Sequence, residues 1–309
     1  MDVCPICARS DLVAGGSYRG SHPTFKGMQR TSCRLCGMVF ASPMPSEKAL
    51  EQYNSSYFCT AHGDQRRTAS GAAFFSGIAR LRLDYIECYL RKNNITVLRL
   101  LELGPGPGFF ARAWLEKHPT TEYLACETDT SCHASLKLLG VKLLDSFSLD
   151  LESKTFDLVV MSHVLEHVPK PTDFLAAASG ALREGGALFI EVPCRDYEHK
   201  SIDEPHLLFF DKQPMQHLLH NGGFENIATS YYGVPITRLQ SWSTLRALLL
   251  AFRTRLINVG LVAPFALDRQ EMEGLDALEC AVLAPFEAHR ESSTPAWWLR
   301  AVATRRCAE

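Results

Sequence analysis

The chain has 309 residues, of which 46% are hydrophobic and 21% are charged, and its formal net charge is −2. This composition is that of an ordinary globular protein and argues against extensive disorder, while the slight acidity disfavours a nucleic-acid binder, which usually carries a basic excess. No apolar run follows the first Met and no apolar stretch is long enough to span a membrane, so we expect a cytoplasmic protein without signal peptide or transmembrane segment.

The first 45 residues carry two CxxC pairs, Cys4–Cys7 and Cys33–Cys36. Each pair can place two thiolates on one cation, and two pairs complete a closed tetrahedral Cys₄ site. In a reducing compartment paired cysteines favour a metal over disulfides, although a redox CxxC and coincidence are the alternatives. The pattern predicts a small zinc-ribbon-like module at 1–45, with a structural zinc ion bound by Cys4, Cys7, Cys33 and Cys36.

Residues 46–95 predict a connector and N-terminal helices, because apolar side chains recur at helical spacing between Ala72 and Lys92. Over 96–309 short apolar runs alternate with helical patterns. The predicted strands are 97–103, 122–127, 141–144, 156–162, 187–193, 225–233 and 296–306, and the predicted helices are 109–118, 131–140, 171–186 and 213–224. Such alternation predicts a doubly wound α/β domain with helices on both faces of a mainly parallel sheet.

A glycine-rich loop, ELGPGPG at 102–108, closes the first of these strands and opens a helix. Glycines let the backbone approach a ligand, and the helix N-terminus offers free N–H groups. The GxGxG spacing, with Phe109 where a dinucleotide-binding loop would have a third glycine, favours a smaller zwitterion such as the methionine end of S-adenosylmethionine (SAM). Glu127 ends the next strand, where a carboxylate can accept hydrogen bonds from both ribose hydroxyls. The alternative is a tight turn in a non-binding α/β protein.

A helical insertion at 234–293 interrupts the alternation, with a basic amphipathic helix at 241–259 and a second helical piece near 276–288. The apolar face of the first helix consists of Trp242, Leu245, Leu249, Phe252 and Leu256. A lid or a homodimer contact is the favoured interpretation. Peripheral contact with anionic lipid, or contact of its arginines with a phosphate-bearing acceptor, is the alternative.

Four motifs in order resemble those of the class I SAM-dependent methyltransferases: LLELGPGPGFF (100–110), Glu127, FDLVVMSHVLEHV (156–168) and LREGGALFIEVP (182–193). The resemblance covers 97–233 and 296–306. It implies a seven-stranded Rossmann-like methyltransferase sheet in the order 3-2-1-4-5-7-6, with the last strand antiparallel. It also implies methyl transfer from SAM.

Carried over position by position, the resemblance implies that the three loop glycines line the methionine and ribose, that Glu127 holds the ribose and that Ser162 lies under the sulfonium. Asp145 to Phe147 follow the third strand, where the family contacts the adenine edge, although the usual acidic-then-small pairing is only loosely kept. The implied cofactor-binding residues are Glu102, Gly104, Gly106, Gly108, Glu127, Asp145, Ser146, Phe147 and Ser162.

The N-terminal region, with its exit CRLCGMVFASPMPSEKALEQYNSSYF (33–58), is similar to the zinc-binding region of some methyltransferases that act on nucleotide sugars, polysaccharides or secondary metabolites. The resemblance implies a small-molecule acceptor that is methylated on O or C. An RNA methyltransferase that grips RNA with the zinc module is the alternative, although residues 1–40 hold only five Arg and Lys against two Asp and Glu. A non-catalytic SAM-sensing or scaffold protein is the third.

Methylation of an O or C nucleophile requires a group that removes a proton, and His is the usual one. His206 in DEPHLLFF (203–210) is similar to the EHxxxF stretch of sugar C-methyltransferases, whose His is the proposed base, although Pro205 interrupts that pattern. A His that only shapes the loop is the alternative. The second catalytic candidate is His163, at the end of the fourth strand; weaker ones are His167, His199 and, for substrate binding, Tyr197.

Overall fold

The computed structural model describes residues 3–50, 52–53, 68–145, 155–241, 244–262 and 290–307. Several predictions from the sequence lie outside these residues. They are the adenine-edge contacts of Ser146 and Phe147, the position of Trp242 on its helix, and the helical piece near 276–288.

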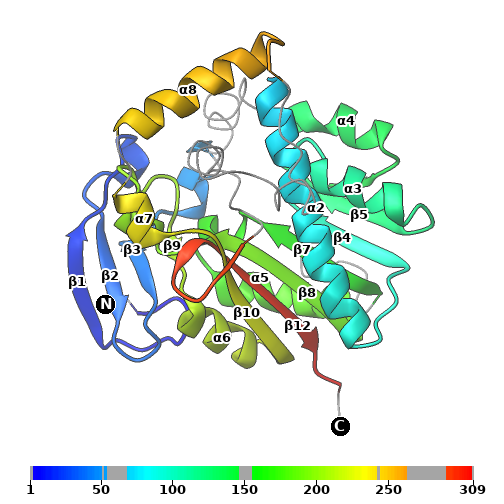
Figure 1. The fold of residues 1–309 in the computed structure, drawn as a ribbon. Coiled ribbons are helices and arrows are strands. Elements are labelled where there is room, and N and C mark those ends of the chain that lie inside the picture. Colours follow the sequence, from blue (N-terminus) through cyan, green and yellow to red (C-terminus); the bar gives the residue numbers. More distant parts are fainter. Residues whose placement is uncertain are drawn as a thin grey trace.

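An eight-stranded sheet forms the centre of the molecule, in the order β11-β10-β12-β8-β7-β4-β5-β6 (Figure 1). Its strands are β4 (Arg99–Leu103), β5 (Glu122–Cys126), β6 (Lys142–Leu144), β7 (Phe156–Ser162), β8 (Leu182–Pro193), β10 (Phe224–Pro235), β11 (Glu291–Ser292) and β12 (Ala296–Arg305). Strands β4 to β8 pair in parallel, whereas β12 runs antiparallel to both β8 and β10. Without β11, the strands stand in the order 3-2-1-4-5-7-6 when numbered from β4. The two-residue β11 makes the sheet eight-stranded, where the sequence predicted seven strands.

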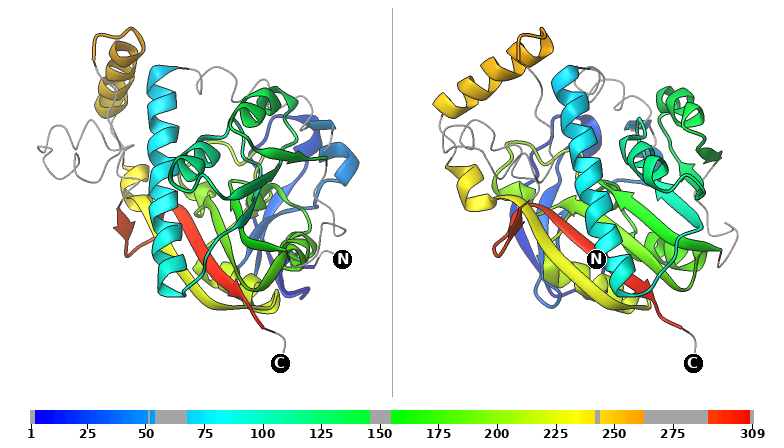
Figure 2. Two further views of the ribbon diagram at one scale, coloured as in Figure 1. Left: turned by 90° about the vertical axis from the view of Figure 1, so that its right-hand side faces the viewer. Right: turned by 45° about the vertical axis from the view of Figure 1, so that its right-hand side comes forward.

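Successive side chains of a strand point to opposite sides, so apolar side chains lie on both faces of this sheet. Helices cover both faces. One face, with Leu100 and Leu158, is covered by α2 (Ala69–Lys92), α3 (Phe109–Lys117) and α4 (His133–Leu138). The other face, with Leu101 and Val159, is covered by α5 (Pro171–Ala181) and α6 (Lys212–Asn221). Figure 2 shows α2 lying along its face of the sheet for much of the sheet's height.

The predicted helix 171–186 is too long, because α5 ends at Ala181 and β8 begins at Leu182. Leu182 is fully buried and pairs with Phe156 of β7. Gly185 has a φ of +70° and lies where the register between β7 and β8 shifts. The glycine therefore allows the irregularity in β8, and it does not end a helix as the sequence suggested.

A second sheet of four strands, in the order β1-β2-β3-β9, forms beside the first, and its strands β1 to β3 are drawn in blue at the left of Figure 1. Three strands come from the N-terminal module: β1 (Leu12–Ser17), β2 (Gln29–Cys33) and β3 (Val39–Ser42). The fourth, β9 (Leu208–Phe209), follows β8 and pairs antiparallel with β3. One hydrophobic cluster contains Phe40 of the module and Phe209 of the larger domain. The sheet and its core therefore cross the boundary that we predicted between 1–45 and 96–309.

Asp203, which precedes β9, holds the two parts together by charge. Its buried carboxylate accepts hydrogen bonds from the Arg19 backbone N–H at 2.7 Å, from Arg19 Nε at 3.1 Å and from Arg30 Nη1 at 2.7 Å. Arg19 also donates from Nη2 to the Tyr197 carbonyl at 2.6 Å. A buried carboxylate is costly unless it is paired, so the docking of the module depends on both arginines.

Two helices follow β10, α7 (Ile236–Gln240) and α8 (Thr244–Asn258). Figure 2 shows α8 standing clear of the central sheet beside one end of α2. Asn258 Oδ1 accepts hydrogen bonds from Ser70 N at 3.1 Å and from Ser70 Oγ at 2.7 Å, and this contact joins the two helices. The apolar side chains of Leu245, Leu249 and Phe252 are exposed. The roles of lid, dimer contact or lipid contact stay predictions. Among the helices of the described residues, none combines the length and apolarity that crossing a bilayer would require.

Replacing Asp203 by Ala should lower the free energy of unfolding by about 2 kcal/mol or more, because it leaves two arginines without their carboxylate. Arg34→Ala is the matched control, since Arg34 and Asp11 are exposed and lie 3.9 Å apart; we expect a change within about 0.5 kcal/mol. Urea unfolding of the three proteins measures both. Equal losses for the two variants would contradict the proposed importance of the Asp203 contacts.

Candidate active site

The carboxyl ends of β4, β5, β7 and β8 meet at one edge of the sheet, where ligands bind in open α/β sheets. The residues predicted from the sequence follow these strands. They are the loop 104–108 after β4, Glu127 after β5, Asp145 after β6, His163 after β7 and His206 in the long segment after β8. The structure therefore brings the loop glycines, Glu127, Asp145, His163 and His206 to the same edge.

The loop 104–108 needs glycine because its backbone has positive φ angles and because neighbouring side chains leave no room for a Cβ. Gly104, Gly106 and Gly108 have φ angles of +67°, +56° and +87°. A Cβ on Gly104 would lie 2.7 Å from Val164 Cγ2, and a Cβ on Gly108 would lie 2.9 Å from atoms of both Leu136 and Leu139. Gly108 is also the N-cap of α3, so the loop leads directly to a helix N-terminus with free N–H groups.

Glu127 is tied to this loop. Its Oε2 accepts a hydrogen bond from the Gly106 N–H at 2.6 Å, and its Oε1 accepts one from the Asp129 N–H at 2.8 Å. A carboxylate has about four acceptor positions, so two are left for the hydroxyls of a ribose. Asp145, at the end of β6, is exposed near the same edge.

Glu102 lies deeper than the loop that follows it. Its side chain is buried on the face covered by α2 and α3, where Tyr123 Oη donates a hydrogen bond to Oε2 at 2.5 Å. Burial raises the pKa of Glu102 to about 7, while the Tyr123 hydrogen bond and Arg82 act in the opposite direction. Glu102 thus supports the loop from below, and its predicted contact with a cofactor stays a prediction.

His163 is held between two carboxylates. Its φ is +57°, its Nδ1 lies 3.3 Å from Glu166 Oε1, and its Nε2 lies 3.4 Å from Glu191 Oε1. Burial lowers the pKa of His163, but the two carboxylates outweigh it, so the pKa lies above its usual value. Glu191 in turn accepts a hydrogen bond from Arg300 Nε at 2.7 Å and pairs with Arg82. An imidazole that keeps its proton is a poor base, which disfavours that role for His163.

His206 has a different environment. Its Nδ1 lies 2.6 Å from Oδ2 of Asp196, a buried residue of η5 (Asp196–Glu198) that also receives Lys200 Nζ at 2.9 Å. Burial opposes ionisation of Asp196, but His206 and Lys200 outweigh it and hold the pKa of that carboxyl well below its usual range. Asp196 therefore fixes the ring through Nδ1 and leaves Nε2 to exchange a proton.

The N-terminal module also reaches this segment. Tyr18 Oη donates a hydrogen bond to the His206 carbonyl at 3.0 Å, and Glu204 accepts hydrogen bonds from the Ser21 N–H at 2.7 Å and from Tyr53 Oη at 2.9 Å. Together with Asp203, these contacts hold both sides of the short loop that carries His206. The position of the proposed base therefore depends on a part of the chain far away in sequence.

Two residues of this edge were not singled out from the sequence. Asp196 had no signal beyond its place after β8. Glu166, in η4 (Leu165–His167), stood inside the VLEHV motif, where the sequence analysis weighed only the histidines. The His167 and His206 rings lie 4.9 Å apart, and Glu166 lies between His163 and His167.

Tyr197 and His199, the weaker candidates in the segment after β8, differ in their surroundings. The Tyr197 ring lies under the Arg30 guanidinium, 5.5 Å from its centroid, and packs edge-on against Phe209. His199 Nδ1 is buried and has no hydrogen-bond partner among the described residues, and burial lowers the pKa of this side chain. Ser162 Oγ, at the end of β7, is likewise buried without a partner in the described part of the chain.

The four cysteines of the two CxxC pairs meet in the N-terminal module. Cys4 Sγ lies 3.4 Å from Cys36 Sγ, and Cys7 Sγ lies 3.5 Å from Cys33 Sγ. All four sulfurs lie within 4.8 Å of one another. These distances exceed a disulfide bond of about 2.0 Å and approach the edge of about 3.8 Å of a tetrahedron with Zn–S bonds near 2.3 Å. The cluster has the donor set and the arrangement of a metal site.

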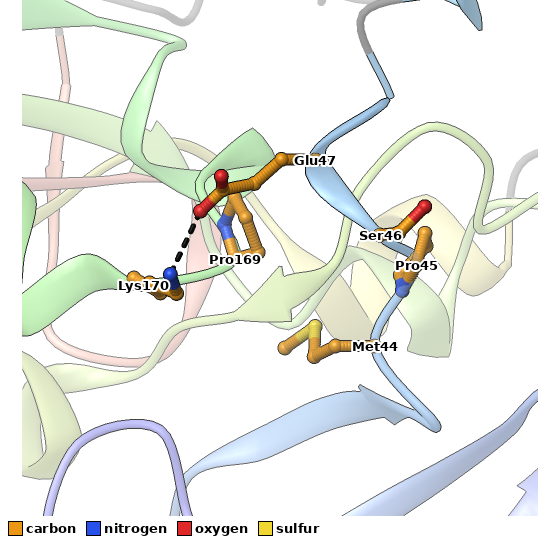
Figure 3. Close-up of a pocket in the computed structure, with 6 residues that line it drawn as sticks. All are labelled: Met44, Pro45, Ser46, Glu47, Pro169 and Lys170. Carbon is orange, nitrogen blue, oxygen red and sulfur yellow. Dashed lines mark ion pairs between the residues drawn. The ribbon is translucent and has the colours of Figure 1, made fainter. Parts of the chain in front are cut away.

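A pocket of about 290 Å³ lies between the exit of the module and the start of α5 (Figure 3). It is lined by Met44, Pro45, Ser46, Glu47, Pro169 and Lys170. Figure 3 shows Glu47 and Lys170 facing each other, with Nζ and Oε1 2.8 Å apart. None of the predicted cofactor or catalytic residues is among the described residues that line this pocket.

A methyltransferase-domain family model matches residues 66–229. No curated protein matches the chain. The fold is similar to a putative sarcosine dimethylglycine methyltransferase from Galdieria sulphuraria, at 14% identity and a TM-score of 0.49, over 73% of this chain and 86% of that one. It is also similar to Haemonchus contortus phosphoethanolamine N-methyltransferase 2 in complex with S-adenosyl-L-methionine, at 13% identity and a TM-score of 0.49, over 87% of this chain and 63% of that one. Likeness at this level carries no information about the acceptor.

Replacing Gly108 by Ala should destabilise the protein by about 1–2 kcal/mol, because φ is +87° and the added Cβ meets two leucines. Gly180→Ala is the matched control. Gly180 lies in α5, and an added Cβ would have no atom within 4 Å, so we expect a gain of up to about 1 kcal/mol from helix propensity. Chemical denaturation gives both values. Two changes of the same sign would contradict this view of the loop.

Proposed function

This chain belongs to the methyltransferase-domain family, and we propose that it transfers a methyl group from SAM to an O or C nucleophile of a small-molecule acceptor. One observation carries the proposal. At the carboxyl edge of one sheet, a glycine loop is tied to Glu127, and the segment after β8 holds His206 against Asp196. The first pair is suited to a sulfonium nucleoside, and the second is suited to taking a proton.

Gly104, Gly106 and Gly108 would hold the methionine and ribose parts of SAM, and Glu127 would accept the ribose hydroxyls. Asp145 would lie toward the adenine with Ser146 and Phe147, and Ser162 would lie nearest the sulfonium. SAM, when bound, supplies a methyl group already activated by positive charge. The chain must therefore align the acceptor and exclude water from the edge, and it must remove a proton from the nucleophile.

His206 would take that proton at Nε2. Asp196, ionised and buried, holds Nδ1 and stabilises the imidazolium that forms. His163 is the second candidate, but its two carboxylate neighbours favour the protonated ring. A charged His163 would then contribute to orientation and to the electrostatics of the edge.

The favoured acceptors are sugars, nucleotide sugars, polysaccharides and secondary metabolites, in line with the resemblance of the N-terminal module. An RNA acceptor is the alternative. In the module, Arg19 and Arg30 both donate to the buried Asp203, so these two cations are engaged within the chain. This observation favours a small molecule. The cytoplasmic location and the homodimer stay predictions.

The acceptor class is tested by incubating the protein with methyl-labelled SAM and panels of nucleotide sugars, polysaccharides, secondary metabolites and bulk RNA. Formation of S-adenosylhomocysteine together with label in one small molecule supports the proposal. Label in RNA alone would replace it by the alternative. No S-adenosylhomocysteine with any panel, together with tight SAM binding, would favour a SAM-sensing protein.

Glu127→Ala should weaken SAM binding by about 2 kcal/mol, or roughly 30-fold in Kd, because the ribose loses a charged acceptor. Isothermal titration calorimetry measures the affinity. A melting curve checks that the variant is still folded, because it also loses the hydrogen bond from the Gly106 N–H. The control is Glu116→Ala, which removes an exposed carboxylate of α3 and should leave Kd unchanged. An unchanged Kd in Glu127→Ala would remove Glu127 from the cofactor site.

His206→Ala should lower kcat by about 10²–10⁴-fold while the affinity for SAM stays the same, because only proton removal is lost. The assay uses the acceptor found in the panel. His220→Ala, an exposed histidine of α6, is the control and should keep full activity. Wild-type kcat in His206→Ala would end its assignment as the base.

We also propose that Cys4, Cys7, Cys33 and Cys36 bind one structural zinc ion, which would stabilise a module with little core of its own. Metal analysis of purified protein should find about one zinc per chain. Cys33→Ser should lose it, whereas Cys88→Ser, an exposed cysteine of α2, should keep it. Equal zinc content in the two variants would contradict the assignment.

A further inference from the structure

Glu166 is a buried carboxylate whose ionised form is favoured by nearby histidines. The residue is 1% exposed, and neither Oε1 nor Oε2 has a hydrogen-bond partner among the described residues. His163 Nδ1 lies 3.3 Å from Oε1 without hydrogen-bond geometry, and His167 Nε2 lies 3.9 Å away. Buried polar groups without partners are rare, and the binding of an ion is one recognised reason for them.

The surroundings of Glu166 have the form of a metal site. Glu166, His167 and His206 each offer one ligand atom, and these three atoms lie within 4.8 Å of one another. His206 is held from behind through Nδ1 by Asp196 at 2.6 Å, and the His167 ring hydrogen-bonds to the backbone carbonyl of Pro205. Metal-binding histidines almost always have such a partner on the second ring nitrogen, which orients the ring and fixes its tautomer.

We propose that Glu166, His167 and His206 bind a divalent transition-metal ion at the carboxyl edge of the sheet, separate from the cysteine cluster. Two imidazoles and one carboxylate form a donor set of nitrogen and oxygen, which is suited to ions such as Zn²⁺, Co²⁺ or Fe²⁺, whereas four thiolates select Zn²⁺ among these. A second carboxylate, that of Asp196, pairs with Lys200 and His206 and lies behind the ligands. The two sites therefore differ in ligand chemistry and in position.

Metal binding has a consequence for His206, which rests on the proposed function. The lone pair of Nε2 cannot bind a cation and accept a proton at the same time. An occupied site therefore removes the base and slows methyl transfer. The ion would act as an inhibitor of the reaction, and its release would restore the Asp196–His206 pair.

Cobalt provides the direct test, because Co²⁺ bound by nitrogen and oxygen absorbs weakly in the visible, whereas Co²⁺ bound by thiolates also absorbs strongly in the near ultraviolet. The full-length protein is first loaded with Zn²⁺ and then dialysed against a chelator until about one Zn²⁺ per chain, that of the cysteine cluster, is left. The chelator is removed, and Co²⁺ is then added while absorbance and heat are recorded. We expect about one Co²⁺ per chain with visible bands and no thiolate band. Glu166→Gln and His206→Ala should each weaken this binding at least about 10-fold, and Asp196→Asn should weaken it by about 10- to 100-fold.

His220→Ala is the matched control and should bind Co²⁺ like the wild type. If Glu166→Gln does not fold by circular dichroism, His167→Ala and His206→Ala decide the outcome. Absence of any Co²⁺ binding outside the cysteine cluster, or equal affinity in the wild type and these variants, overturns the proposal. SAM calorimetry on the same proteins separates this failure from a failure of the proposed function, because Glu166→Gln should keep SAM affinity.

In the methyl-transfer assay, Co²⁺ should slow the wild type as its site fills, and a rate independent of Co²⁺ would refute the inhibitory role.

Discussion

The contacts of Asp203 with Arg19 and Arg30 determine how the two parts of the molecule meet. The carboxylate is buried, and it accepts hydrogen bonds from four donor groups of the N-terminal module, three from Arg19 and one from Arg30. Three residues later the same segment carries His206, and five residues later it becomes β9 and joins the N-terminal sheet. The loop between is too short to move independently of its ends. The position of the proposed base therefore depends on the contacts of Asp203 with the two arginines.

The two halves of the candidate site are built by different means. The cofactor side belongs to the parallel sheet itself, where the glycine loop leaves β4 and Glu127 leaves β5, and neighbouring strands place them together. The acceptor side depends on the module, since Tyr18 and Glu204 contribute contacts around His206 from opposite directions. This division fits a family in which SAM binding is shared and acceptors differ. Loss of the zinc ion that we propose for the cysteine cluster would therefore also loosen that loop.

His163 and His206 lie at the same edge of the sheet but have different charged neighbours. His163 lies between Glu166 and Glu191, so its positive charge is favoured, whereas His206 has one carboxylate, Asp196, at Nδ1. Environments that push similar groups toward different protonation states are how active sites separate their acids from their bases. Glu166 adds a second property, because it stands between the histidines without a hydrogen-bond partner of its own among the described residues.

The sequence by itself determined the features that depend on near neighbours. Strand and helix alternation, the glycines of 104–108, Glu127 and the two CxxC pairs all follow from local spacing, side-chain volume and φ. Even there it misjudged the end of α5, because Leu182 is drawn into β8 by pairing with Phe156 and not by any local signal. Only the tertiary structure decided which side chains share a site. Asp203 and Arg30 are 173 positions apart, and β9 is a strand of two residues that exists only because β3 is beside it. Likewise, Asp196 is an ordinary loop acid until the fold places it behind His206. Such contacts arise from the burial of charge and from packing between distant segments, which leave no periodicity in the sequence to read.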